Sequence, residues 1–234
     1  MRTERGLDRL ITFLDAVVAI AITLLVLPLV DALRGASPHE LGTALRAESG
    51  SFAAFLLSFA VIARLWLAHH RLVEHVGGYD RPFVLVNMVW ILGIVVLPFA
   101  TQVVAFFATN RLAVAIYIGT ITVSSACLSA MSLLVWRRPA LRRDGDDARS
   151  VTPWPSLLTT SALVLALLLG VLVPAINYYG LLLLFLTAPF EALLRRRAEA
   201  GGDAGAAPPE ALDAGSSAGT ADEPGSVPEE RSTS

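Results

Sequence analysis

The sequence has few charged residues, a single cysteine and no lysine. Charged residues make up 16% of the 234 residues, hydrophobic residues make up 55%, and the mean hydropathy is +0.63. These values lie outside the range of soluble domains. Because Cys127 stands alone, an intramolecular disulfide is impossible and a zinc cluster is excluded. The composition therefore predicts an integral membrane protein. Because no Ser, Cys or metal cluster has catalytic spacing, we do not expect an enzyme.

Long apolar runs are frequent, and a bilayer core about 30 Å thick needs about 20 helical residues to cross it. Suitable runs occur at 9–32, 51–75, 82–107, 111–136, 156–176 and 178–195. We therefore predict an all-α membrane protein with six transmembrane helices within residues 1–197. The first run is too long for a signal peptide core, so we expect it to remain in the mature protein. Residues 198–234 are rich in Gly, Ala, Pro, Ser and acids, which predicts a disordered tail.

Arginine is distributed unevenly between the two sides of the predicted bundle. With both termini in the cytoplasm, the inner segments contain thirteen arginines and the outer segments contain three. The inner set is Arg2, Arg5, Arg9, Arg71, Arg81, Arg137, Arg138, Arg142, Arg143, Arg149, Arg195, Arg196 and Arg197, and the outer set is Arg34, Arg46 and Arg111. Because segments rich in basic residues stay in the cytoplasm, this asymmetry predicts a multi-pass cell-membrane protein with cytoplasmic N and C termini.

Polar side chains from three predicted helices lie at one depth in the membrane. At a rise of about 1.5 Å per residue, Asp15 lies about 9 Å from the inner end of the first helix. His69 and His70 lie about 8 to 9 Å into the second helix, and Asn87 about 8 Å into the third. In lipid each of these groups needs a partner, and acid, imidazole and amide groups can satisfy one another. We predict that they form a buried clasp between helices, with Trp66 among its members.

Other interpretations of these polar residues remain open. A metal site of Asp15 with His69 and His70 is disfavoured, because adjacent histidines on a helix point about 100° apart and seldom bind one ion together. We therefore predict no metal site. A proton relay remains possible because histidine titrates near neutral pH. The corresponding alternative function is a proton-coupled or other secondary transporter that uses Asp15 and the two histidines.

The first helix carries a second face, opposite the clasp. At about 100° per residue, Asp15 lies some 140° from Ile20 around the helix. The residues within about 60° of Ile20 are Phe13, Ala16, Thr23, Leu24, Leu27 and Asp31. This face is apolar apart from Thr23 and Asp31, and periodicity alone does not distinguish packing, lipid contact or another role.

The stretch "RLITFLDAVVAIAITLLVLPL" resembles the R-x-x-x-F-S-D signature that opens the first helix of the transmembrane protein 175 family. This family comprises endosomal and lysosomal potassium channels and their prokaryotic homologues. Arg9, Phe13 and Asp15 match the signature, and Leu14 replaces its usual Ser. The stretch "FLLSFAVIARLWLAHHRLVEHV" is similar to the family's S-F…W-x-x-H-H pattern, and "LVNMVWILGIVVLPFATQ" supplies Asn87 and the L-P-F triplet. The resemblance extends from residue 9 to about residue 136.

The resemblance implies a passive, potassium-permeable cation channel whose pore is lined by the first helix of every subunit. The implied pore-lining residues are Ile20 at a hydrophobic constriction, followed by Thr23, Leu24 and Leu27. Because the family lacks a carbonyl filter, modest selectivity for K⁺ over Na⁺ is expected. One helix per chain cannot enclose a pore, so a single-repeat chain is expected to form a homotetramer. The expected partners are the lipid bilayer and monovalent cations, with no cofactor and no nucleic acid.

Overall fold

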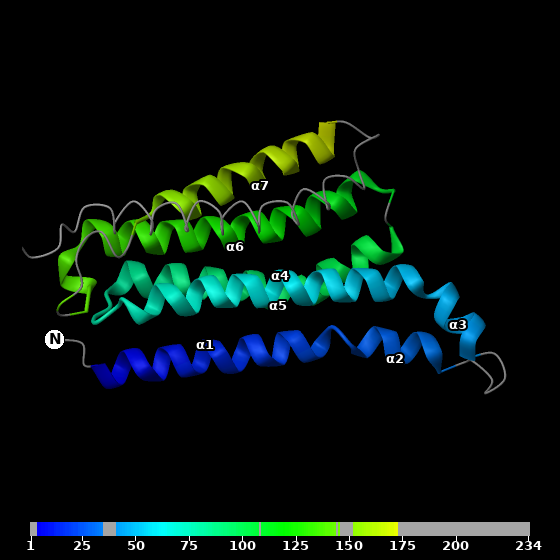
Figure 1. Ribbon diagram of the computed structural model, residues 1–234, viewed down its shortest axis with the longest axis horizontal. Helices are drawn as coiled ribbons and strands as arrows, with labels where there is room; N and C mark the ends of the chain where they lie inside the picture. The colour runs from blue at the N-terminus through cyan, green and yellow to red at the C-terminus, as the bar shows by residue number, and fades with distance from the viewer. Residues whose placement is uncertain (1–3, 35–40, 108, 144, 146–151, 173–234) are drawn as a thin grey trace, which may run out of the picture. The chain divides into compact units, whose positions relative to one another are not determined.

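The computed structural model describes residues 4–34, 41–107, 109–143, 145 and 152–172. The regular elements in these ranges are helical (Figure 1). They are α1 (Glu4–Leu24), α2 (Leu27–Leu33), α3 (Leu41–Ala47), α4 (Ser49–Glu74), α5 (Arg81–Phe106), α6 (Arg111–Arg137), the short 3₁₀ helix η2 (Pro139–Leu141) and α7 (Trp154–Leu172).

Four stretches in the described chain are long and apolar enough to cross a membrane. They are Arg5–Leu33, Ser49–Glu74, Arg81–Phe106 and Arg111–Arg137. The prediction of an all-helical membrane protein is therefore confirmed. The predicted fifth span corresponds to α7, whose described apolar part, Trp154–Leu168, is shorter. The predicted sixth helix, 178–195, and the predicted tail, 198–234, lie outside the described residues.

The first span is broken near its end. We predicted a transmembrane helix over 9–32, and the structure divides this span into α1, from Glu4 to Leu24, and α2, which starts at Leu27. Pro28 lies in the first turn of α2, and its ring nitrogen cannot donate a helical hydrogen bond. The amides of Leu25 and Val26 bridge the interruption by donating to carbonyls three residues earlier, each at 3.3 Å, in place of the four-residue helical spacing. Figure 1 shows α2 continuing in the direction of α1.

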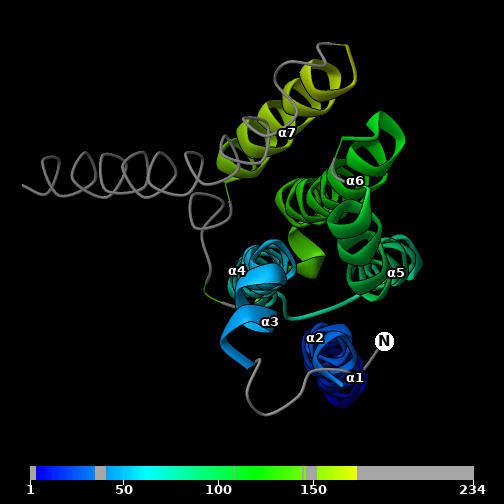
Figure 2. The same cartoon turned by 90° about the vertical axis from the view of Figure 1, so that its right-hand side faces the viewer.

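The long helices pack side by side, as the view along them in Figure 2 shows. α5 contacts α1, α4 and α6, and α6 in turn contacts α4 and α7. Trp90 of α5 and Tyr117 of α6 are fully buried in this core. α5 and α6 approach closely at Gly93, where an added Cβ would lie 2.3 Å from the Ser124 hydroxyl. α1 contacts α4 and α5, so one side of α1 is held by the bundle.

The end of the bundle where α1 begins is closed by a contact between two connecting segments. We call this contact, between residues 75–80 and 138–143, the end latch. The amides of Gly77 and Gly78 donate to the carbonyl of Leu141 at 3.0 and 3.3 Å, and the amide of Arg143 donates to the carbonyl of His75 at 3.0 Å. Gly77 is needed here because an added Cβ would lie 2.8 Å from the Arg143 Cα.

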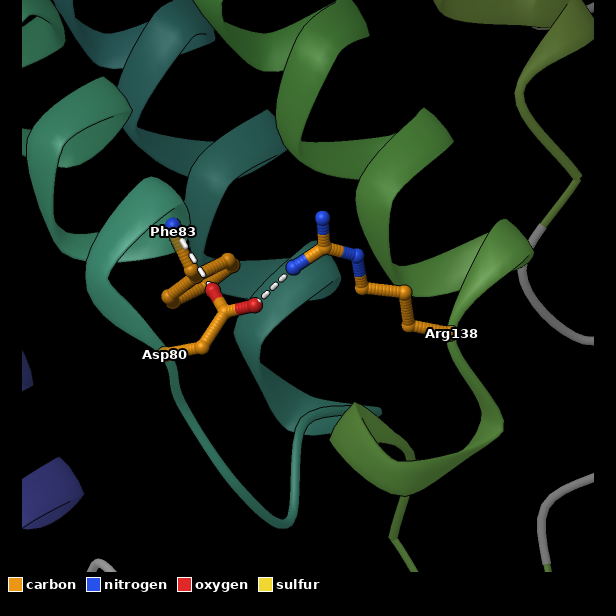
Figure 3. Close-up of polar contacts among 3 residues, drawn as sticks. All are labelled: Asp80, Phe83 and Arg138. Atoms are coloured by element: carbon orange, nitrogen blue, oxygen red, sulfur yellow. Dashed lines mark hydrogen bonds and ion pairs between the residues drawn. The ribbon is translucent and has the colours of Figure 1, made fainter.

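Asp80 joins the end latch to two helices (Figure 3). Its Oδ1 accepts a hydrogen bond of 2.9 Å from the amide of Phe83 and so caps the first turn of α5. Its Oδ2 forms an ion pair with Arg138 at the end of α6. The neighbouring Tyr79 packs against α1, since a Cβ added to Gly6 would lie 2.4 Å from the tyrosine hydroxyl. The end latch therefore connects α4, α5 and α6 and reaches the first turns of α1.

The two roles of Asp80 can be separated by substitution. Asp80→Ala removes both the cap and the ion pair, whereas Asp80→Ser retains a capping hydroxyl and loses only the ion pair. We expect Asp80→Ala to lower the free energy of unfolding by about 1 to 2 kcal/mol, because a lost cap usually costs about 1 kcal/mol and a lost surface ion pair up to about 1 kcal/mol more. Asp80→Ser should have a smaller effect. Thermal unfolding of the full chain in detergent measures both. Equal melting temperatures for Asp80→Ala and the wild type would contradict the assignment.

Candidate functional site

α1 presents one face to α4 and α5. Its buried residues are Leu7, Leu14, Val18, Ala21 and Leu25. Their spacings of three, four and seven place them along one stripe of the helix. Leu14 is part of this stripe and therefore contributes apolar packing. The stripe fixes which side of α1 faces away from the bundle.

The opposite face carries the residues predicted to line a pore. Ile20, Leu24 and Leu27 are 59%, 42% and 52% exposed, and Thr23 is exposed beside them. The Thr23 hydroxyl donates a hydrogen bond of 2.8 Å to the carbonyl of Ile20. Its proton is therefore satisfied within the helix. In the described chain this face is an uncovered apolar surface that runs across the break between α1 and α2.

The three signature residues of α1 lie on different sides of the helix. Arg9 and Phe13 are exposed and one turn apart, whereas Asp15 is half-buried and turned toward α4. Asp15 Oδ1 accepts a hydrogen bond of 2.8 Å from Trp66 Nε1. This bond connects α1 to α4 and gives the acid of an apolar helix the donor that it needs.

A second polar pair connects α4 to α5. His69 Nε2 lies 2.8 Å from Asn87 Oδ1, and the Asn87 amide donates to the carbonyl of Phe83 at 2.8 Å. His69 and Asn87 are fully buried. The His69 ring also stacks on Trp90 of α5, with centroids 4.1 Å apart and ring planes 10° apart. Hydrogen bonding and aromatic stacking together position His69.

Four of the five residues predicted to form one clasp thus lie as two hydrogen-bonded pairs, and the fifth, His70, belongs to neither pair. The Asp15 carboxylate bonds Trp66, and the Asn87 amide oxygen meets His69. His70 is 46% exposed in its side chain; it stacks on Trp66 with centroids 5.3 Å apart, and its Nε2 lies 3.7 Å from a carboxylate oxygen of Glu74. The described residues include no group of three or more His, Cys, Asp or Glu side chains that could hold a metal ion.

A further polar cluster, which the sequence analysis missed, joins α4, α5 and α6 toward their other end. The hydroxyls of Ser58 and Tyr117 are 3.0 Å apart, and the Thr101 hydroxyl lies 2.8 Å from that of Ser58. Thr101 also hydrogen-bonds the carbonyl of Leu97 in its own helix. The sequence carries a signal for this cluster, since its members lie five to nine residues from the helix ends at the same side of the bundle and therefore at similar depth.

These contacts hold α1 in one orientation, and they do not assemble a reactive group on its exposed face. Packing by the Leu14 stripe and the Asp15–Trp66 hydrogen bond act on the buried side. The exposed side offers branched apolar side chains and one hydroxyl. Such a surface can exclude water or pack against another apolar surface, and no bond-making chemistry follows from it.

Residues 9–98 match the sequence model of the family described as "Endosomal/lysosomal potassium channel TMEM175". The matched segment contains both polar pairs and most of α1 and α5. The resemblance identified in the sequence is therefore confirmed over these residues.

Two curated relatives have names that describe potassium channels. The protein from Streptomyces collinus is 33% identical over 113 residues, which are 47% of this chain and 54% of the relative. The protein from Chamaesiphon minutus is 35% identical over 122 residues, which are 50% of this chain and 59% of the relative. The chain thus spans little more than half the length of these curated relatives.

A solved structure shares the fold. The crystal structure described as a lysosomal potassium-selective channel TMEM175 homolog from Chamaesiphon minutus superposes with a TM-score of 0.63. The superposition covers 80% of this chain and 98% of the other, at 22% sequence identity. At this level of identity the similarity concerns the architecture of the helices.

The Asp15–Trp66 hydrogen bond can be tested by a double-mutant cycle. The variants are Trp66→Phe, Asp15→Leu and the double substitution, each compared with the wild type for unfolding in detergent. We expect a coupling free energy of about 0.6 to 1.7 kcal/mol, the range found for hydrogen bonds between membrane helices. The cycle cancels the packing lost with the indole ring. Strictly additive effects of the two single substitutions would contradict a direct interaction.

Proposed function

We propose that this chain, whose residues 9–98 match the TMEM175 family, is a potassium-permeable cation channel. Ions pass down their gradient through a central pore lined by α1 of each subunit, without a cofactor and without a covalent step. The single observation that carries the proposal is the exposed apolar face of α1, with Ile20 at its centre, on a helix whose other side is fixed to α4 and α5. The names of the relatives from Streptomyces collinus and Chamaesiphon minutus, both potassium channels, support the choice of ion.

The proposed assembly is a homotetramer in the cell membrane. One exposed helical face cannot surround an ion path, so several copies of α1 must meet around a symmetry axis. We infer six spans within residues 1–197, with both termini and the 198–234 tail in the cytoplasm, because most arginines then lie inside. In this topology the end latch is cytoplasmic.

The proposed constriction is a ring of Ile20 side chains, followed by Thr23, Leu24 and Leu27. Branched apolar side chains that meet at a symmetry axis exclude water, and a small widening of the ring would admit a partly hydrated ion. The ring has no carbonyl oxygens to replace the hydration shell, which supports modest selectivity for K⁺ over Na⁺. The break between Leu24 and Leu27 provides a point at which the ring of Leu27 side chains on α2 can move separately from the ring of Ile20 side chains on α1.

The polar pairs have an indirect part in this proposal. By connecting α1 to α4 and α4 to α5, the Asp15–Trp66 and His69–Asn87 contacts hold the Ile20 face toward the axis. A rotation of α1 by one residue, about 100°, would turn Ile20 away from the axis. The role assigned to these residues is therefore positioning.

Substitution of Ile20 tests the proposed pore directly. In liposomes containing purified protein, Ile20→Asn should increase K⁺ flux severalfold, because an amide in the ring lowers the cost of hydrating it. Leu92→Asn is a matched control: Leu92 is similarly exposed in mid-helix, but it lies on α5. The control should leave flux at the wild-type level.

Two results would contradict the proposal. One is liposomes that remain sealed to K⁺ with both the wild type and Ile20→Asn. The other is uptake that saturates, follows a pH gradient and is lost in Asp15→Asn, which is the behaviour of a proton-coupled transporter.

A further inference from the structure

The far end of α2 carries two opposite charges in direct contact. Arg34 Nη1 lies 3.2 Å from Asp31 Oδ1, and the side chains are 75% and 63% exposed. The backbone amide of Arg34 also donates to the carbonyl of Asp31 at 3.2 Å, which keeps the two residues in the same turn. Exposed ion pairs contribute only about 0 to 1 kcal/mol to stability. Their removal should therefore leave the fold intact.

This pair lies on the same side of the helix as the proposed pore face. The buried residue of α2 is Leu29, so the side of α2 opposite Leu29 faces away from the bundle. Asp31 follows Leu27 by one turn, about 40° around the axis, and Arg34 follows Leu27 by seven residues, about 20° in the other direction. α2 continues the direction of α1 (Figure 1). The charges therefore extend the Ile20–Leu27 face at the end of the pore helix.

We propose that Asp31 and Arg34 control cation entry at this mouth of the pore, with Arg34 masking the charge of Asp31. The inference rests on the proposed channel function and adds a determinant of conductance to it. In a symmetric assembly each copy contributes one carboxylate and one guanidinium to the mouth. A ring of carboxylates alone would concentrate K⁺ near the entrance, and the adjacent guanidinium groups cancel most of that attraction.

The sign and salt dependence of this effect are fixed by electrostatics. Neutralising Arg34 should increase cation entry, neutralising Asp31 should decrease it, and neutralising both should return it close to the wild-type value. All differences should vanish at high salt, because the screening length falls from about 30 Å at 0.01 M to about 3 Å at 1 M. A merely structural role for the pair would not produce a salt-dependent change of opposite sign in the two variants.

The test is single-channel recording of the full chain in planar bilayers, with KCl at 10 mM or 1 M on the side of Asp31. We expect Arg34→Gln to raise the conductance at least twofold at 10 mM and to match the wild type at 1 M. Asp31→Asn should lower it at 10 mM, and the double variant should resemble the wild type. Arg46→Gln is the matched control, since it removes the same charge from α3 at the same end of the bundle and should change conductance less.

Three outcomes would overturn the inference. Equal conductance of Arg34→Gln and the wild type at 10 mM would show that the pair does not face the ion path. An equal effect of Arg46→Gln would show that any charge on this side of the membrane acts alike. A silent wild type would overturn the channel proposal as well, and this result is distinguishable because it appears before any variant is compared.

Discussion

Everything proposed for this protein depends on how α1 is held along one side. A buried stripe of small and branched residues packs against α4 and α5, and the Asp15 carboxylate receives a hydrogen bond from Trp66 within the same contact. In lipid such a bond holds the acid in place, because breaking the bond would leave the acid without a hydrogen-bond donor in an apolar environment. The opposite face then has a fixed direction, and its apolar character acquires a functional meaning only because α1 cannot rotate freely.

Contacts among α4, α5 and α6 fix the helices against which α1 packs. α5 touches α1, α4 and α6, and the His69–Asn87 pair together with the His69–Trp90 stack joins α4 to α5. At the end where α1 begins, Asp80 caps α5 and binds Arg138 of α6, while Tyr79 packs beside Gly6. A hydroxyl cluster of Ser58, Thr101 and Tyr117 connects the helices toward the other end. Polar contacts therefore join α4 to α5 at two depths, and they include α6 at the hydroxyl cluster and at the end where α1 begins. α1 is attached to this framework.

The sequence predicted the helical membrane architecture, because a run of about 20 apolar residues has the length and composition of a membrane-spanning helix. It also identified the polar residues at the depth of Asp15, since rise per residue fixes depth. It did not predict their pairing: side-chain direction decides that Trp66 meets Asp15 and that His70 turns toward Glu74. The end latch was not predictable, because residues 75–80 and 138–143 are brought together only by the packing of three helices. Pro28 was visible in the sequence, yet a proline in a membrane helix does not by itself determine whether the helix bends or breaks.

The central claim is that copies of α1 meet around one axis with Ile20 facing inward. Cysteine cross-linking in membranes tests it most directly, using Ile20→Cys in a Cys127→Ser background, with Leu92→Cys in the same background for comparison. The account predicts that oxidation rapidly converts the Ile20→Cys protein into covalent dimers, whereas the Leu92→Cys protein stays monomeric. Persistence of Ile20→Cys as a monomer under conditions in which its thiol is shown to be reactive would place this residue away from its copies and contradict the claim.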